Sequence, residues 1–459
     1  MNSVNDKQLF SRRQFPVLSR AGRDTVRRLL GHPNAPLSRE VCGHRLTRRD
    51  VWRARWRQWQ VMHTDVPWSV DATAPPPWAD EWLHQLARTV PAARGLAGRP
   101  WADVPLVSRS DLSYALHLHT PENLPRDRLL WLATRGTTGH PLNVPSLPSL
   151  AAEEHAYRRR ALRHFGVEPR AGAGQVGMVQ LLFQKHGAMV ASLNPIQRDC
   201  GIAKLNLHPE GWRSPGDRAL YIDAMAPELV SGDPVSLAEL AGLGLKHRPC
   251  AILSTSMALH EGLRRELEWR FRCPVLDMYG MNESGPIGVF DPKVDGFVLL
   301  QPRLHVEIVD AAGRPLPYGQ FGEIVLSGGF NPCLPLLRYR TGDHALLALS
   351  PRGPVLRSLV DRELVRYRGP GGRWVDNTAL SQALAPFPLV RFTLHQQADG
   401  QLVLRAAAME PLANLAPRLR EAVEAPFGAT LPLTIEPLVA DDNQRRQFTS
   451  DLSEPDTPC

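Results

Sequence analysis

Short apolar runs alternate with helical segments between residues 175 and 280, and this alternation limits the fold more than any other feature of the sequence. QVGMVQLLF (175–183), CAILSTS (250–256) and CPVLDMYG (273–280) are typical of buried strands, and SMALHEGLRRELEWRF, between the last two, has helical spacing. Strands that alternate with helices are typical of a largely parallel sheet. The sequence therefore predicts an α/β fold.

The pattern changes after residue 304. The runs LHVEIVD, EIVLSG and HALLAL, with a turn at AAGRPLPYGQFG, predict a β-rich region from 304 to 349. In the last hundred residues, VRFTLHQQ and DGQLVLRAAA precede a helix predicted at 411–425, as in a small α+β domain. A chain of 459 residues exceeds the size of a single core. We expect a basic helical region at 1–105 packed on a core domain at 106–360, followed by a small domain at 361–459.

Positive charge gathers near the N-terminus, where the pattern from 24 to about 60 is helical. Residues 1–60 carry 13 arginines and Lys7 against four carboxylates, a balance of +10, whereas the whole chain has +8. A basic helical face could contact nucleic acid or an acidic carrier. A solvated N-terminal appendage is favoured, and we expect no nucleic-acid partner.

Several features predict a cytoplasmic protein with no membrane partner. SRRQF (11–15) resembles a twin-arginine export signal, but Arg20, Arg23 and Arg27 interrupt the apolar segment that such a signal needs. The six cysteines have no C-x-x-C spacing, so neither a disulfide framework nor a zinc ribbon is indicated. No stretch of about 18 apolar residues occurs.

A glycine-rich stretch, TRGTTGHP (134–141), follows the apolar run LLWL and precedes a helical pattern at 149–165. Its glycines let the backbone approach a ligand, and its hydroxyls and N–H groups suit phosphate oxygens. The spacing of a Walker loop is missing. We expect the order strand, glycine loop, helix, and an ordinary strand-to-helix turn is the alternative interpretation.

The stretch DMYGMNESG (277–285) directly follows a predicted strand. Tyr279 could offer a flat face to a purine, and Glu283 could reach a metal ion held by phosphates. The alternative is a tyrosine that packs and a glutamate that is solvated.

A third stretch, LRYRTGDHALL (337–347), contains an Arg-Thr-Gly-Asp turn predicted between strands. Asp343 at this turn could accept two hydrogen bonds from a ribose diol. A structural turn in which the aspartate caps its own backbone competes with that interpretation.

Taken in this order, the three stretches resemble motifs of the adenylate-forming superfamily of acyl- and aryl-CoA ligases, and within it the phenylacetate-CoA ligase-like branch. The glycine loop is similar to the family's phosphate loop, YGMNE to its Y-G-x-T-E motif, and YRTGD to its R-T-G-D motif. GRPLPYGQFGEIVLSG (313–328) is similar to its G-x-x-x-P-x-G-x-x-G-E hairpin. The resemblance runs from about 106 to 452. It implies a large adenylation domain of mixed sheets with helices and a β-rich subdomain, and a small mobile C-terminal α+β domain.

The resemblance implies a ligase that uses ATP and Mg²⁺ to activate a carboxylic acid, aryl or aryl-acetic by analogy. The acyl-adenylate then passes to a thiol of coenzyme A or of a carrier protein's phosphopantetheine. The residues that it assigns to the nucleotide are Thr134, Gly136, Thr137, Thr138, Gly139, Tyr279, Gly280, Asn282, Asp343 and Arg362. Glu283 would hold Mg²⁺, and a homodimer is compatible with the branch.

Two departures from the family pattern concern the motif and the hinge. Asn282 stands where the motif usually has threonine, and its amide can still donate to the α-phosphate, so we count it with Glu283 as catalytic. The G-R-x-D hinge appears as DREL (361–364), which places the pivot near Asp361.

A third departure concerns a positively charged side chain near the C-terminus. The family's C-terminal lysine falls at Asn443, and the last lysine of the chain is Lys293. Arg445 or Arg446 would supply the missing charge, although an arginine fork differs from a point charge.

Three functions therefore remain open. The favoured one is an acid–thiol ligase. The second is an adenylating ligase that passes the acyl group to an amine or hydroxyl in a biosynthetic pathway. The third is a catalytically impaired nucleotide-binding paralogue, a hypothesis that is based on the missing lysine.

Overall fold

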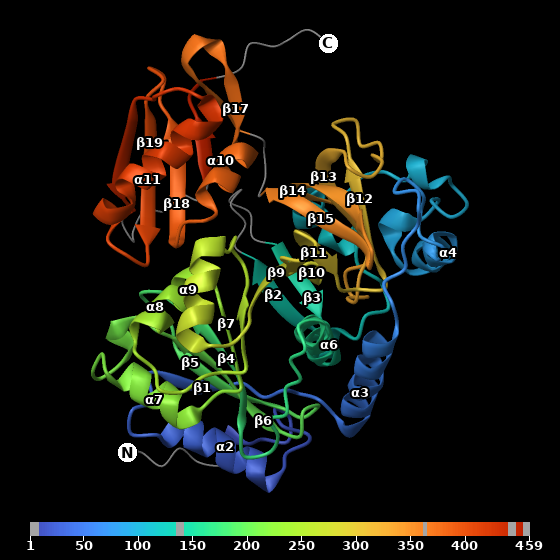
Figure 1. The fold of residues 1–459 in the computed structure, drawn as a ribbon. Helices are drawn as coiled ribbons and strands as arrows, with labels where there is room; N and C mark the ends of the chain where they lie inside the picture. Colours follow the sequence, from blue (N-terminus) through green and yellow to red (C-terminus); the bar gives the residue numbers. More distant parts are fainter. Residues whose placement is uncertain (1–8, 135–141, 361–364, 439–446, 453–459) are drawn as a thin grey trace.

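A 13-stranded sheet organises the larger part of the molecule in the computed structural model, which describes residues 9–134, 142–360, 365–438 and 447–452 (Figure 1). The strand order is β1-β5-β6-β4-β7-β8-β9-β10-β11-β15-β14-β13-β12. From β1 to β9 the pairs are parallel except for β5 with β6, and from β9 onward every pair is antiparallel. The β9–β10 hairpin therefore joins a parallel half to an antiparallel half.

The strands of the parallel half are β1 (Arg39–Val41), β4 (Val176–Leu182), β5 (Met189–Asn194), β6 (Cys200–Asn206), β7 (Leu229–Gly232), β8 (Ala251–Ser254) and β9 (Val275–Met281). Those of the antiparallel half are β10 (Gly285–Asp291), β11 (Gly296–Leu299), β12 (Leu304–Val309), β13 (Phe321–Gly328), β14 (Leu336–Ser350) and β15 (Gly353–Val360). The helices of this larger unit are α2 (Arg20–Gly31), α3 (Arg48–His63), α4 (Ala79–Thr89), α5 (Arg109–Ala115), α6 (Pro148–His164), α7 (Asp217–Met225), α8 (Pro234–Gly242) and α9 (Glu261–Phe271).

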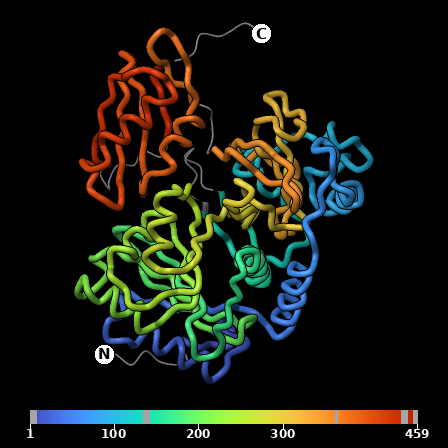
Figure 2. The backbone as a smooth tube through the Cα atoms, in the orientation of Figure 1, coloured from blue at the N-terminus to red at the C-terminus, as the bar shows by residue number. Residues whose placement is uncertain are grey.

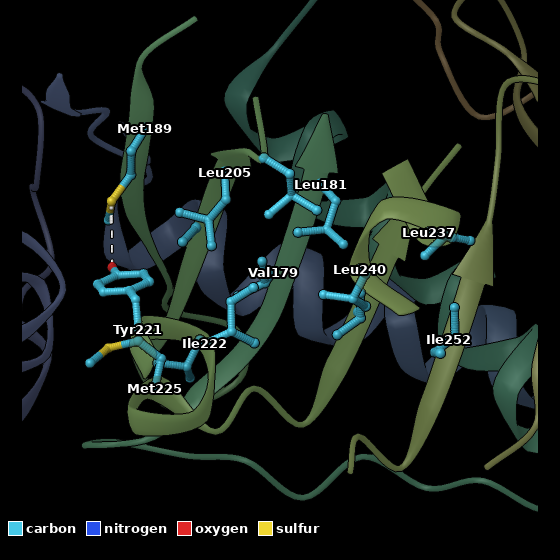
Figure 3. Packing of buried hydrophobic residues seen from close by; sticks show 14 of the residues in the cluster. Val179, Leu181, Met189, Leu205, Tyr221, Ile222, Met225, Leu237, Leu240 and Ile252 are labelled. Atoms are coloured by element: carbon cyan, nitrogen blue, oxygen red, sulfur yellow. Dashed lines mark hydrogen bonds between the residues drawn. The ribbon is translucent and has the colours of Figure 1, made fainter. Parts of the chain in front are cut away.

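The parallel strands are apolar on both faces because helices cover both faces of this half. Val179 and Leu181 of β4 join a core cluster with residues of α2, α7, α8 and α9, whereas Met178 packs with α6 in another cluster. Figure 3 shows the first cluster, where the Tyr221 hydroxyl lies 3.4 Å from the Met189 sulfur. The continuous apolar runs of the sequence thus correspond to strands buried on both sides.

The C-terminal part forms a separate unit with its own core. Its four-stranded sheet has the order β20-β19-β18-β21. The elements are β16 (Arg366–Arg368), β17 (Trp374–Asp376), α10 (Asn377–Leu384), β18 (Leu389–Gln396), β19 (Leu402–Ala408), α11 (Leu412–Glu424), β20 (Leu433–Pro437) and β21 (Phe448–Ser450). Figure 2 shows this unit, in orange and red, next to the parallel half.

The two units touch at the first turn of α9. The N–H of Gly262 donates to the carbonyl of Ala385 at 3.0 Å, and the ring of His260 lies 5.2 Å from that of Phe392. A Cβ added at Gly262 would lie 2.2 Å from the carbonyl carbon of Phe387, so only glycine permits this close approach. Burial lowers the pKa of His260 to about 4, which keeps its ring neutral in this interface.

The predicted α/β fold with a separate C-terminal α+β unit is confirmed, whereas the boundaries at 105 and 360 stay predictions. Three local expectations are wrong. The glycine loop does not lead directly into a helix, because β2 (Leu130–Thr134) pairs antiparallel with β3 (Leu142–Ser146), and α6 begins only at Pro148. Residues 142–146 alternate between buried and exposed positions over part of their length, and prolines at 145 and 148 keep them out of the helix.

The N-terminal region is not a solvated appendage. Val26 and Leu29 of α2 are fully buried in the main core, and β1 extends the large sheet by pairing with β5. The helical pattern expected from 24 to 60 is interrupted because HPNAP (32–36) contains two prolines that end α2. In the parts of the chain that the structure describes, no helix combines the length and apolar character needed to cross a bilayer.

The third correction concerns residues 341–343, predicted as a turn between strands. They lie inside the 15-residue strand β14. The register with β13 shifts there, since Glu323 faces His344 and Val325 faces Arg340. Two extra residues of β14 are thus accommodated as a bulge, with Gly342 at φ +82°.

Candidate active site

The β9–β10 hairpin carries the motif YGMNE at the junction of the two halves of the sheet. Gly280 faces Pro286, and a Cβ at Gly280 would lie 2.7 Å from the carbonyl oxygen of Gly285, so the two arms require glycine to close. The buried Gln301 stabilises the hairpin, because its amide nitrogen donates to the carbonyls of Ser284 and Pro286, each at 2.7 Å. The position of residue 283 is therefore fixed by both its neighbours and a remote side chain.

Glu283 lies at the turn of this hairpin with only 4% of its side chain exposed. Its Oε1 accepts a hydrogen bond from Arg109 at 2.6 Å and one from the Tyr339 hydroxyl at 3.3 Å. Burial raises the pKa of Tyr339, and the neighbouring Glu283 raises it further, so the tyrosine stays a neutral donor. The Glu283 carboxylate is therefore held in place by one cationic and one neutral hydrogen-bond donor.

Arg109 reaches Glu283 because the chain before α5 pairs with β14. The N–H of Val107 donates to the carbonyl of Arg338, and the N–H of Arg340 donates to the carbonyl of Val107. A capping box between Ser108 and Asp111 then starts α5, whose first residue is Arg109. An arginine 174 positions from Glu283 in sequence thereby becomes its ion-pair partner.

Tyr279 and Asp343 meet in the structure. The Tyr279 hydroxyl donates to Oδ2 of Asp343 at 2.8 Å, although β10, β11 and β15 separate their strands in the sheet. The antiparallel half therefore curls until β9 and β14 approach each other. The two residues assigned to the base and the sugar of a nucleotide thus lie side by side.

Glu323 of β13 holds the bulge that presents Asp343. Its carboxylate accepts a hydrogen bond from the Nε of Arg340 at 2.8 Å and one from the N–H of Gly342 at 3.2 Å. The Thr341 hydroxyl donates to the carbonyl of Ile324 at 2.9 Å and accepts the N–H of Asp343 at 3.0 Å. The glutamate of the G-x-x-x-P-x-G-x-x-G-E hairpin therefore holds the R-T-G-D motif in place.

The other predicted site residues divide into two groups. Gly280 and Asn282 are exposed on the same hairpin as Glu283. Thr134 ends β2 and is the first residue of the glycine loop. The remaining residues lie outside the described parts of the chain: Gly136, Thr137, Thr138, Gly139, Arg362, Arg445 and Arg446.

Sequence reasoning missed Arg109, Gln301, Glu323 and Tyr339 as members of the site. Glu323 and Tyr339 lie inside or beside quoted motifs, so motif spacing could have indicated them. Arg109 and Gln301 carry no local signal, because their roles depend on contacts between segments that are distant in sequence.

Asp277, two residues before Tyr279 on β9, is a further, partly buried carboxyl near the site, and desolvation raises its pKa from 3.8 to about 7. Arg264 and the N–H of Leu259 act in the opposite direction. Because the folded-state pKa lies above the unfolded value, this group contributes stability at low pH that is lost as pH rises from about 4 to about 7.

Asp277→Asn should remove that loss. The free energy of unfolding of the variant relative to the wild type should rise by on the order of 3 kcal/mol between pH 4 and pH 8. Arg264 keeps Glu261 and Glu268 as ion-pair partners in the variant, so no cation is orphaned. Urea unfolding at both pH values measures the effect, and a difference that does not change with pH would contradict it.

The arrangement offers one firmly held carboxylate beside a cation, with an aromatic hydroxyl and a second carboxylate nearby. Among the described residues, no group of three or more His, Cys, Asp or Glu side chains gathers as a complete metal site. A single carboxylate suits Mg²⁺, which usually takes one or two protein carboxylates and completes its shell with phosphates and water.

Comparisons with known proteins agree with these motifs. The chain is similar to the phenylacetate-coenzyme A ligase of Pseudomonas putida, 35% identical over 99 residues, which is 21% of this chain and 23% of the relative. It is similar to the enzyme of the same name from Aromatoleum evansii, 33% identical over 113 residues, 24% of each. The matches thus span less than a quarter of these relatives' length. No protein-family model matches the sequence.

The fold is similar to that of 2-hydroxyisobutyryl-CoA ligase in a postadenylation state, with a TM-score of 0.56 and 18% identity. The alignment covers 87% of this chain and 89% of that one. The resemblance read from the motifs is therefore confirmed: the chain has the fold of the adenylate-forming CoA ligases and a segment similar in sequence to phenylacetate-CoA ligases.

Proposed function

We propose that this chain, which has the fold of the adenylate-forming CoA ligases, activates a carboxylic acid with ATP and transfers the acyl group to a thiol. The observation that carries the proposal is the meeting of Tyr279 with Asp343, close to the buried Glu283 and Arg109. Residues from two separate motifs, YGMNE and YRTGD, lie together with Arg109, which supports a site for the base, sugar and phosphates of a nucleotide.

Glu283 is the residue that would hold Mg²⁺, because it is a buried carboxylate already placed beside a cation. The ion would neutralise phosphate charge when bound. Arg109 balances the Glu283 carboxylate in this structure, and its guanidinium can turn to phosphate oxygens when a cation takes its place. Tyr339 keeps the carboxylate oriented throughout.

Tyr279 and Asp343 would hold the nucleoside: the ring of Tyr279 lies against the base, and Asp343 accepts hydrogen bonds from the ribose. Asn282, exposed at the hairpin turn, would donate to the α-phosphate. The loop residues Thr134, Gly136, Thr137, Thr138 and Gly139 would bind the outer phosphates, with Arg362 a second ribose contact.

In the first step the substrate carboxylate oxygen attacks the α-phosphorus, and the bond to the bridging oxygen breaks, which releases pyrophosphate. In the second step a thiolate attacks the acyl carbon and AMP leaves. The chain's residues contribute position and charge in both steps. The acyl donor class that we propose is aryl or aryl-acetic, supported by the similarity in sequence to phenylacetate-CoA ligases. The acceptor is coenzyme A or a carrier protein's phosphopantetheine.

Pyrophosphate release with a panel of carboxylic acids tests the first step. Adding coenzyme A, and then a phosphopantetheinylated carrier protein, identifies the acceptor. Formation of an adenylate that neither thiol consumes, but that an amine or hydroxyl does, would replace the thiol-ligase proposal with the second hypothesis.

A catalytically impaired nucleotide-binding paralogue is the second candidate, favoured by Asn443 at the position of the family's lysine. Binding of ATP without pyrophosphate release, across the whole panel of acids, would support it and would contradict the enzyme.

A further inference from the structure

Helix α3 presents a row of exposed tryptophans, which we call the tryptophan ridge: Trp52, Trp56 and Trp59. Their exposed fractions are 67%, 49% and 52%. Positions separated by three and four residues lie on one face of a helix, so the three indoles line up along it. The opposite face, with Val51 and Ala54, is buried, and α3 packs along α6.

Two of the three indoles of the ridge are stacked on each other. The ring centroids of Trp56 and Trp59 lie 5.1 Å apart with an interplanar angle of 19°, and those of Trp59 and His63 lie 4.8 Å apart at 28°. Trp59 thus stacks on both Trp56 and His63, so part of the aromatic face area is occupied within the row.

Arginines flank the ridge. Arg49 and Arg53 precede Trp52 and Trp56 by three residues each, which places them beside these indoles on the helix surface, and both are exposed. They belong to the segment 1–60 with its balance of +10. The ridge therefore combines exposed aromatic area with positive charge.

Figures 1 and 2 show α3, in blue, at the edge of the molecule beside α6. Single exposed apolar residues are ordinary, but a contiguous aromatic row bordered by charge marks an interaction surface. No described segment covers this row, since its three indoles stay about half or more exposed.

We propose that the tryptophan ridge binds the surface of an anionic lipid bilayer. Tryptophan is the side chain that favours the boundary between headgroups and acyl chains, because its ring is apolar and its N–H remains hydrogen-bonded. Guanidinium groups remain charged and grip phosphate oxygens. An interfacial helix with aromatic residues and flanking arginines combines affinity for the headgroup boundary with attraction to anionic lipid phosphates. This surface contact differs from the expectation of no membrane partner and is independent of the proposed enzymatic function.

Two other occupants fit the ridge less well. Nucleic-acid bases bind by stacking on free aromatic faces, and here the faces of Trp56 and Trp59 are stacked on each other. A protein partner would need a groove shaped to this row of side chains, whereas a bilayer adapts to it.

Co-flotation of the full chain with vesicles tests the proposal. The vesicles contain phosphatidylcholine with about 30% phosphatidylglycerol, or phosphatidylcholine alone, at about 0.1 M salt, where the Debye length is about 10 Å. We expect binding to the anionic vesicles that weakens as salt is raised, and little binding to the neutral ones.

Three tryptophan replacements together, Trp52→Ser, Trp56→Ser and Trp59→Ser, should abolish flotation. The matched control is Trp269→Ser, which removes an indole that is 72% exposed on α9. Arg49→Gln with Arg53→Gln should lower the partition coefficient about 30-fold, since each arginine near an anionic surface contributes a factor of about five. Arg248→Gln with Arg270→Gln removes the same charge elsewhere and should change it little.

Circular dichroism and the thermal midpoint establish whether each variant is folded. If the triple tryptophan variant is not folded, the two arginine double variants and the salt titration test the proposal instead. No flotation of the wild type with anionic vesicles overturns the proposal. So does equal flotation of the ridge and control variants, or retention by DNA or an acidic polypeptide without vesicle binding. ATP binding and pyrophosphate release, measured without lipid, should be the same in the ridge variants as in the wild type. Failure of the lipid-binding proposal is therefore distinct from failure of the enzymatic proposal.

Discussion

Glu283→Gln should lower pyrophosphate release by roughly 10²- to 10³-fold, the effect of removing one preorganised charge from a phosphoryl-transfer site. The glutamine keeps the size of the side chain but cannot act as an anionic ligand for Mg²⁺. The loss should be larger at low Mg²⁺, because the ion then depends more on the protein's own carboxylate. Initial rates across a Mg²⁺ titration measure it.

Two controls separate this effect from damage to the fold. Tyr339→Phe removes the hydrogen bond to Glu283 but leaves the Arg109 ion pair, and should cost about tenfold or less. The thermal midpoint of Glu283→Gln shows whether Arg109 without its partner destabilises the chain. A folded Glu283→Gln variant with an unchanged rate would contradict the assignment of Glu283.

Changing Arg445 and Arg446 together to alanine should depress adenylate formation by a similar factor, roughly 10²- to 10³-fold. The reason is the absence of any lysine after Lys293, which leaves these arginines to neutralise the carboxylate and phosphate oxygens. Pyrophosphate release in single-turnover conditions measures this step directly.

Adding Asn443→Lys to the double variant should restore part of the rate, because a lysine then occupies the position where the family carries it. Arg352→Ala, at an exposed position in the turn between β14 and β15, controls for the loss of positive charge. Unchanged adenylate formation in the double alanine variant would contradict the role assigned to these arginines.

The sequence was most informative where the chemistry of a site is local. YGMNE and YRTGD each place their functional residues within a few positions, so the motifs and their resemblance to the adenylate-forming superfamily together predicted Tyr279, Glu283 and Asp343 as candidates. The structure brings Tyr279 and Asp343 into contact, although the roles assigned to them stay predictions.

Contacts between distant segments could not be read from spacing. Arg109 meets Glu283 only because Val107 pairs with β14, and Gln301 holds the hairpin from another strand. The β2–β3 pair was also missed, because a strand of five residues between a glycine loop and a helix leaves too short a pattern to separate from either. Likewise, the bulge at Gly342 looks like a turn until its partner strand is known.

By itself, the sequence determined the α/β class, the separate C-terminal unit and three of the motifs, because apolar periodicity and residue spacing are properties of neighbours along the chain. Only the tertiary structure decided that the antiparallel half curls until Tyr279 touches Asp343, that Arg109 balances Glu283, and that three indoles of a basic helix stay exposed. These depend on which surfaces are buried against which, and that is settled when the chain packs as a whole.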